Sequence, residues 1–175
     1  EDPEFENCYP FLFWDLRSLE ALSVSLELCD LLSEQSINSL INAALINTNS
    51  LKALELNLNH TKITDSTTYT LNQNLPSHLK NEFEYFGLLL SNTKINDLRT
   101  SELFTPMPKL KVLKLGFQCT KIAQCTLEAL SSNVLQNADS LEVLDLSFKK
   151  TQIADQDVIL LFQKLKPSLK KLVLN

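Results

Sequence analysis

The chain repeats one hydrophobic pattern, Leu-x-x-Leu-x-Leu-x-Leu, in which Phe or Val sometimes replaces Leu. Full copies start at residues 19, 51, 83, 110 and 141, and a partial copy starts at 169. The last three apolar positions of each copy alternate with other residues, which is typical of a strand. Because the starts lie 27 to 32 residues apart, each repeat has room for a strand, a turn and a helix. Repetition at this period predicts a repeat architecture.

A helix is predicted in the second half of the repeat, where apolar residues recur every three or four positions. The clearest runs are Ile37-Leu40-Ile41-Ala44-Leu45, Leu127-Leu130-Val134 and Val158-Leu161-Phe162-Leu165. Four prolines precede the next strand and mark where helices end: Pro76, Pro106, Pro108 and Pro167. One strand and one helix cannot bury their apolar faces alone, whereas stacked copies can. We therefore predict an α/β solenoid, with parallel strands on one side and helices on the other.

The second repeat contains the segment Leu54-Glu55-Leu56-Asn57-Leu58-Asn59-His60-Thr61-Lys62-Ile63. It resembles leucine-rich-repeat proteins, whose units carry Leu-x-x-Leu-x-Leu-x-x-Asn/Cys-x-Leu. The long repeat with a helix is similar to the ribonuclease-inhibitor-like subclass. The leading Leu51 lies two residues further upstream than the consensus puts it. Over residues 19–175, the resemblance implies a horseshoe of five to six repeats with concave strands and convex helices.

Thr or Cys occupies the Asn/Cys position of that consensus, in the residues Cys29, Thr61, Thr93, Thr120 and Thr151. In the family this side chain faces inward and bonds the backbone of the turn that leaves the strand. A Thr hydroxyl donates one hydrogen bond and also accepts, so the resemblance implies the same role here. A row of catalytic hydroxyls is the disfavoured alternative.

Three aspartates recur just before the helical stretches, at Asp65, Asp97 and Asp155. A helix N-cap belongs at this place, and Asp is a favoured N-cap residue. A metal or acid site is the alternative, but repetition along a solenoid would space these carboxylates apart. We therefore predict that the three residues are N-caps.

The two ends depart from the repeat. Residues 1–18 are predicted to be an N-terminal cap or a cloning-derived segment, and Tyr9, Phe11, Phe13 and Trp14 in it would suit a cap or an anchor for a partner. Residues 19–175 form the predicted leucine-rich-repeat domain. Its last strand would leave an open edge, which native proteins avoid. Further repeats beyond residue 175 are therefore expected to cover this edge, with another chain as the alternative.

Charge and composition narrow the classes of partner. The formal net charge is −5 and the pI is about 5.1, which gives no basic footprint for nucleic acid. The lysines near the end, Lys164, Lys166, Lys170 and Lys171, are interpreted as a solvated edge. No apolar run approaches the roughly 20 residues that span a membrane. The spacing of Cys8, Cys29, Cys119 and Cys125 indicates neither a metal site nor a disulfide framework, and favours reduced thiols and a cytoplasmic location.

Catalysis and cofactor binding are not expected. The chain has only 2 glycines, so phosphate-cradling glycine loops are disfavoured. Its 2 histidines, His60 and His78, stand apart from any Cys or carboxylate cluster with metal-ligand spacing. His60 is predicted to be a solvated turn residue. No nucleophile motif such as Gly-x-Ser-x-Gly occurs, although a triad assembles in space and not along the sequence.

The candidate binding residues are the strand positions that face away from the core. In the aligned repeats they place four apolar residues together: Tyr85, Leu89, Val112 and Val143. Four charged residues are predicted to ring them: Glu55, Lys114, Asp145 and Lys149. An apolar centre with a charged rim is typical of a protein-binding patch. The alternative is that β-branched residues simply suit strands.

Three functions remain open. The first is a non-catalytic module that binds a protein on its concave face. The second is a structural subunit buried within a large assembly. The third is the recognition arm of an enzyme, a ligase or kinase, whose catalytic domain lies outside this chain.

Overall fold

The computed structural model describes residues 16–46 and 48–175 and shows an α/β fold. Its single sheet has six parallel strands in sequence order, which confirms the strand predicted in each repeat. The strands are β1 (Ala21–Ser25), β2 (Ala53–Asn57), β3 (Tyr85–Leu89), β4 (Val112–Gly116), β5 (Val143–Ser147) and β6 (Lys171–Leu174). Most of the predicted segment 1–18, with Cys8, lies outside the described residues.

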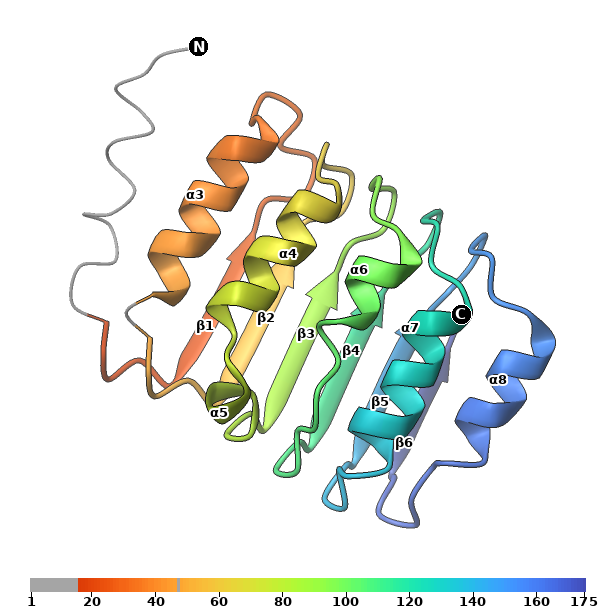
Figure 1. Ribbon diagram of the computed structural model, residues 1–175. Helices are drawn as coiled ribbons and strands as arrows, with labels where there is room; N and C mark the ends of the chain where they lie inside the picture. The colour runs from red at the N-terminus through yellow and green to blue at the C-terminus, as the bar shows by residue number, and fades with distance from the viewer. Residues whose placement is uncertain (1–15, 47) are drawn as a thin grey trace.

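The helices lie on one face of this sheet (Figure 1). They are α3 (Glu34–Leu45), α4 (Asp65–Asn74), α5 (Ser77–Lys80), α6 (Asp97–Ser101), α7 (Gln124–Ala129), the π-helix η1 (Leu130–Leu135) and α8 (Asp155–Phe162). No helix of the described residues lies on the opposite side of the sheet, and we call that side the open face. None of the helices among the described residues has the length and apolar character needed to cross a bilayer.

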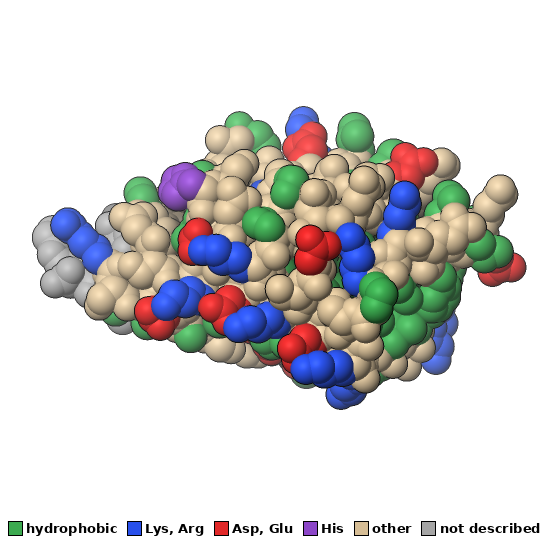
Figure 2. Space-filling model, turned by 90° about the horizontal axis from the view of Figure 1, so that it is seen from below, with side chains coloured by type: hydrophobic (Ala, Val, Ile, Leu, Met, Phe, Trp, Pro, Cys, Tyr) green, Lys and Arg blue, Asp and Glu red, His purple; other side chains and the backbone are tan. Residues whose placement is uncertain are grey.

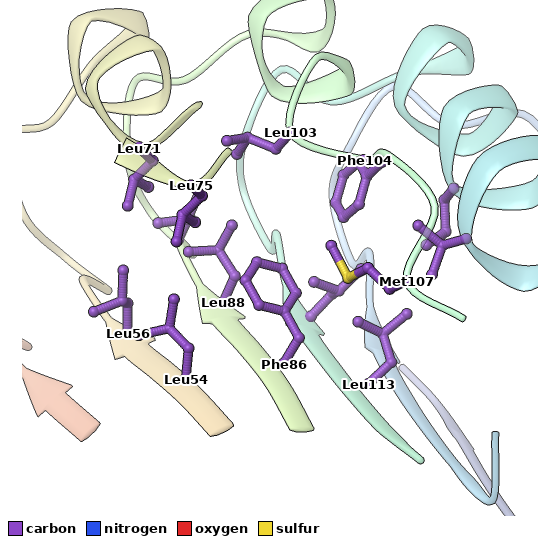
Figure 3. Packing of buried hydrophobic residues seen from close by; sticks show 14 of the residues in the cluster. Leu54, Leu56, Leu71, Leu75, Phe86, Leu88, Leu103, Phe104, Met107 and Leu113 are labelled. Carbon is purple, nitrogen blue, oxygen red and sulfur yellow. The ribbon is translucent and has the colours of Figure 1, made fainter. Parts of the chain in front are cut away.

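The core fills the space between sheet and helices. The repeated leucines pair in register, so that Leu54 lies beside Phe86 and Leu56 beside Leu88, and all four are at most 2% exposed. Leu71 and Leu75 point from the helix layer toward these strand residues (Figure 3). Each apolar strand row is therefore buried by its own helix and by the rows of the neighbouring repeats.

The helices vary in length, and this variation explains the unequal repeats. α3 has 12 residues and buries Ile37 and Ile41, whereas α6 has 5 residues. After α6 the chain returns to β4 through an irregular segment that buries Phe104 and Met107. The sequence pattern did not predict α5, for which Pro76 is the N-cap residue, or the π-helical turns of η1.

Several apolar residues of the repeat pattern are exposed, among them Phe162 and Leu31. Phe162, expected on the inner face of α8, is 40% exposed, and only Leu161 of that helix is buried. Leu31 occupies the position of Ile63, Ile95 and Ile122, which are 0% exposed, but is itself fully exposed. Both of these residues lie in an outer repeat, where fewer neighbours cover the side chains.

The threonines of the Asn/Cys position behave as the resemblance implied. The hydroxyls of Thr61, Thr93 and Thr120 donate to the backbone carbonyl three residues earlier, at 2.7, 2.6 and 2.7 Å. Thr151 makes the same bond to Phe148, at 2.7 Å. Each hydroxyl thereby satisfies a carbonyl of the turn that follows the strand.

The residue before each of these positions adopts a left-handed conformation. The five residues are Leu28, His60, Asn92, Cys119 and Lys150, with φ between 55° and 61°. None is glycine, although this conformation costs other residues roughly 1–2 kcal/mol. In four of the five, all but Lys150, the backbone N–H donates to the next repeat; His60, for example, donates to the Ser91 carbonyl at 2.9 Å and Asn92 to the Gln118 carbonyl at 2.7 Å. We infer that hydrogen bonding between repeats offsets the strain.

The predicted N-cap role of Asp65, Asp97 and Asp155 is wrong by one residue. The N-caps are Thr64, Asn96 and Ala154, and each Asp is the first helical residue. From that position the first two carboxylates reach sideways to the next repeat. Asp97 accepts from the backbone N–H groups of Ala123, Cys125 and Thr126 at 2.9, 2.7 and 2.9 Å. It therefore caps the neighbouring helix α7, whose own N-cap residue is an alanine.

Equivalent carboxylates make the same connection elsewhere. Glu34 accepts from the Thr64 N–H at 2.6 Å, and Asp65 accepts from the Asn96 N–H at 2.7 Å. The series stops at Gln124, because Ala154 donates its N–H to Asp157 of its own helix at 3.0 Å. First-turn carboxylates thus join α3 to α4, α4 to α6, and α6 to α7.

We predict that Asp97→Ala lowers the free energy of unfolding by about 1–3 kcal/mol, because it leaves three N–H groups without their acceptor. Burial raises the pKa of Asp97, but the hydrogen bonds it accepts outweigh burial and hold the pKa below 3.8. The contribution of Asp97 is therefore present above the unfolded-state pKa and is lost as pH falls through the lower folded-state value.

Urea unfolding of the wild type and of Asp97→Ala between pH 2 and pH 7 measures this effect. Asp155→Ala is the matched control, because Asp155 holds the same repeat position but is exposed. Its carboxylate accepts no hydrogen bond from the described residues. Equal losses in the two variants would contradict the capping role.

Lys80 is a buried cation in α5. Its side chain is among the largest fully buried ones, and the residue is 1% exposed. The ammonium donates to Asn72 Oδ1 and to the Leu103 carbonyl, both at 3.1 Å, and no carboxylate pairs with it among the described residues. Burial lowers the pKa of Lys80 to about 8. The charge thus bridges α4 to the segment that follows α6, at a cost in desolvation.

We predict that the Lys80 charge makes stability depend on pH. Between pH 8 and the unfolded-state value of 10.5, the unfolded chain binds the proton more tightly, so stability rises with pH. The free energy of unfolding of the wild type, minus that of Lys80→Met, should rise by up to about 3 kcal/mol from pH 7 to pH 10. Chemical denaturation at each pH measures the difference, and a constant difference would show that Lys80 is not desolvated.

Candidate functional site

The strand register arranges the open face in three rows that cross the sheet. The first row is Ala21, Ala53, Tyr85, Val112, Val143 and Lys171, the second is Ser23, Glu55, Gly87, Lys114, Asp145 and Val173, and the third is Ser25, Asn57, Leu89, Gly116 and Ser147. These rows are the ones expected from the aligned repeats. Alternation along each strand turns these side chains away from the leucine core.

The apolar part of the candidate site is a contiguous run in the first row. Tyr85, Val112 and Val143 occupy adjacent strands and are each partly exposed. Leu89 lies four residues along β3 from Tyr85, a separation of about 13 Å. The charged second row crosses between them, so charges separate the two apolar parts and do not ring one centre.

Two glycines allow side chains to lie flat on the open face. A Cβ at Gly87 would come within 3.0 Å of Glu55 Cγ and 3.1 Å of Tyr85 Cε1. A Cβ at Gly116 would come within 3.1 Å of Leu89 Cδ2. Both glycines are required for this close approach and not for a special backbone angle, since neither has a positive φ.

Three of the predicted residues form one polar network. The Tyr85 hydroxyl donates a hydrogen bond to Glu55, and Lys114 Nζ lies 3.5 Å from the other Glu55 oxygen. Burial raises the pKa of Tyr85 well above 10.0, and the Glu55 hydrogen bond and the charges of Glu55 and Asp145 raise it further. The phenol is therefore held neutral, as a hydrogen-bond donor, with its ring fixed beside Val112.

The other two charged residues lie apart from this network. Asp145 follows Lys114 in the second row and is partly exposed. Lys149 lies beyond the end of β5 and is exposed, so the structure does not bring it together with the others. The site is therefore centred on Tyr85, Glu55 and Lys114.

A charge ladder borders the first row, and we did not predict it. It consists of the residue before the first row in each repeat: Glu20, Lys52, Glu84, Lys111, Glu142 and Lys170. The sign alternates from strand to strand, with N–O distances of 2.6 Å for Lys52–Glu20, 2.6 Å for Lys111–Glu84 and 3.0 Å for Lys170–Glu142. Figure 2, seen from the side where the strands begin, shows these acidic and basic side chains alternating across the molecule. The alternation is visible in the aligned repeats.

The charge ladder and the first row enclose a shallow groove of about 520 Å³ across β1 to β4. The hydrogen bond from Lys111, followed by its charge, lowers the pKa of Glu84. Because each ladder charge has an opposite neighbour, the groove has no excess of either sign. The charge ladder therefore forms one border of the groove and does not attract a polyanion or a polycation.

The remaining chemistry-bearing residues do not converge. In the described part of the chain, no three His, Cys, Asp or Glu side chains are grouped so that they could hold a metal ion. Cys29, Cys119 and Cys125 form no disulfide there. Neither a family model nor a curated protein matches the chain.

We predict that Tyr85 remains un-ionised at pH 10–11, since burial and the Glu55 carboxylate both oppose a phenolate. In a spectrophotometric titration at 295 nm, Tyr85→Phe should leave the absorbance change below pH 11 unaltered. Glu55→Gln should shift the Tyr85 ionisation to lower pH. A smaller absorbance change in Tyr85→Phe below pH 11 would show that the phenol is solvated.

Proposed function

We propose that the chain is a leucine-rich-repeat solenoid that binds a protein partner on its open face, without catalysing a reaction. In this proposal the open face is the concave side of a horseshoe, and the helices form the convex side. The sequential parallel strands, the recurring Thr hydrogen bonds and the single helix-bearing face support the assignment. A repeat scaffold of this kind offers an extended surface that no short loop could supply.

The observation that carries the binding role is the run Tyr85–Val112–Val143 on a face that no helix among residues 16–46 and 48–175 covers. Tyrosine is enriched among the few residues that supply most of the energy at protein interfaces, and a fixed tyrosine loses little entropy on binding. The bond to Glu55 and the close approach to Gly87 hold the Tyr85 ring in place. The adjacent second row supplies the polar rim.

The balanced charges of the open face favour a partner without a strong charge of its own. The charge ladder pairs internally, and Glu55 pairs with Lys114. A strongly acidic or basic partner would gain little steering and would have to break these pairs. We therefore expect the contact to depend on shape and apolar burial more than on salt concentration.

Affinity capture from the native source, followed by mass spectrometry, tests the binding role. The bait chains are the wild type and a triple variant with Tyr85→Glu, Val112→Glu and Val143→Glu, each first shown to be folded by circular dichroism. We expect the triple variant to lose the dominant protein partner, since three buried carboxylates would cost several kcal/mol at an interface.

The matched control carries three glutamates on the helix side, with Leu98→Glu, Ile159→Glu and Leu160→Glu. These residues are 63%, 57% and 47% exposed, so the control adds the same charge without touching the open face. We expect it to keep the partner. Retention by the open-face variant together with loss by the control would refute binding on the open face.

Loss of the partner by the helix-side control would favour a second candidate function, that of a structural subunit buried in a larger assembly. Its supporting observation is a pair of adjacent apolar residues on α8, Ile159 and Leu160, which are 57% and 47% exposed. Apolar residues grouped in this way mark a contact surface more often than isolated ones do.

A further inference from the structure

A second groove lies on the helix side of the molecule, between α3 and α4. It has a volume of about 610 Å³ and is open to solvent. Its walls are one face of each helix, since the lining positions recur every three or four residues along both. Figure 1 shows the two helices running side by side at the N-terminal end of the array. We call this feature the polar groove.

The lining is almost uniform in chemistry. Of ten lining side chains, nine are uncharged and polar, consisting of amides, hydroxyls and the Tyr69 phenol. The exception, Glu34, is already engaged, because its carboxylate accepts from the Thr64 N–H and the Thr67 hydroxyl at 2.6 and 3.0 Å. In a chain with 21% charged residues, this composition sets the polar groove apart from the charge ladder of the opposite face.

Most of these polar groups are available for a ligand. One hydrogen bond joins two lining side chains across the groove, from Asn38 Nδ2 to Ser66 Oγ at 3.3 Å. The side chains of Gln35, Asn42 and Gln73 make no hydrogen bond with any described residue. Asn38 Oδ1 is buried and accepts none within the described chain. An unsatisfied buried acceptor is unfavourable, and a donor that reached it would recover the lost hydrogen bond.

Tyr69 adds an aromatic surface to one wall. The residue is 51% exposed. The guanidinium of Arg99 lies 6.0 Å from the ring centroid and is itself bound to Glu102 at 3.0 Å. This neighbour restricts the ring while leaving half of the residue accessible. A restricted aromatic ring beside amides presents an apolar plate next to paired donors and acceptors.

We propose that the polar groove binds a neutral oligosaccharide. Sugar hydroxyls both donate and accept, and amide and hydroxyl side chains match them in both roles. The C–H face of a pyranose ring can lie against the Tyr69 ring. The groove has no cation cluster to hold a phosphate and no free carboxylate to hold an ammonium group. Its open shape suits several linked sugars, each weakly bound, more than one enclosed sugar.

Binding is tested by isothermal titration and by NMR shifts of the ¹⁵N-labelled chain with three uncharged hexasaccharides: cellohexaose, maltohexaose and N-acetylchitohexaose. We expect at least one to bind, with shifts confined to α3 and α4. Absence of binding by all three at about 10 mM overturns the proposal, as does binding whose shifts map to the open face.

Two variants test which residues bind. Tyr69→Ala should weaken the affinity at least tenfold by removing the aromatic plate. Gln73→Glu keeps size and helix propensity but replaces a donor by a carboxylate, so a tenfold loss without a change in melting temperature is expected. Gln156→Ala on α8 is the control and should bind as the wild type does. Unchanged affinity in both groove variants refutes the oligosaccharide site.

Discussion

Parallel pairing in one register is the constraint on which the rest of the molecule depends. Each repeat presents a row of leucines that its own short helix cannot cover, so burial requires the next repeat to lie alongside without a shift. A slip of one residue would turn Leu54 and Leu56 to solvent and Glu55 into the core. The same register that completes the core therefore also composes the rows of the open face.

The strands and the outward rows could be predicted from the sequence, because both follow from the alternation that each repeat restates. Repetition removes the usual ambiguity of a short apolar run, since six aligned copies agree. The helices were less predictable. α6 is short because the chain after it buries Phe104 and Met107 without helical spacing, and α5 follows a proline that the pattern treats as an end.

The candidate site could be predicted in part. The alignment placed Tyr85, Val112 and Val143 together, but not the bond from Tyr85 to Glu55, because that contact depends on the space above Gly87. The alignment also did not predict that Asp97 caps the neighbouring helix α7, since capping across repeats depends on the spacing between helices. Gly87 and Gly116 make room for the side chains of Tyr85, Glu55 and Leu89 on the open face. From the sequence, the low number of glycines had indicated only that phosphate-binding loops are disfavoured.

The carboxylates that join adjacent helices make the array uneven. Three successive joints have a first-turn acid of one helix holding the start of the next, whereas α8 is capped by its own Asp157. The contact between α7 and α8 therefore lacks a hydrogen bond that the other joints possess, and α8 buries only Leu161. Opening of the array should begin there, with α8 and β6 separating as a unit while β1 to β5 stay paired. In this molecule the order of unfolding is set by which helix caps itself.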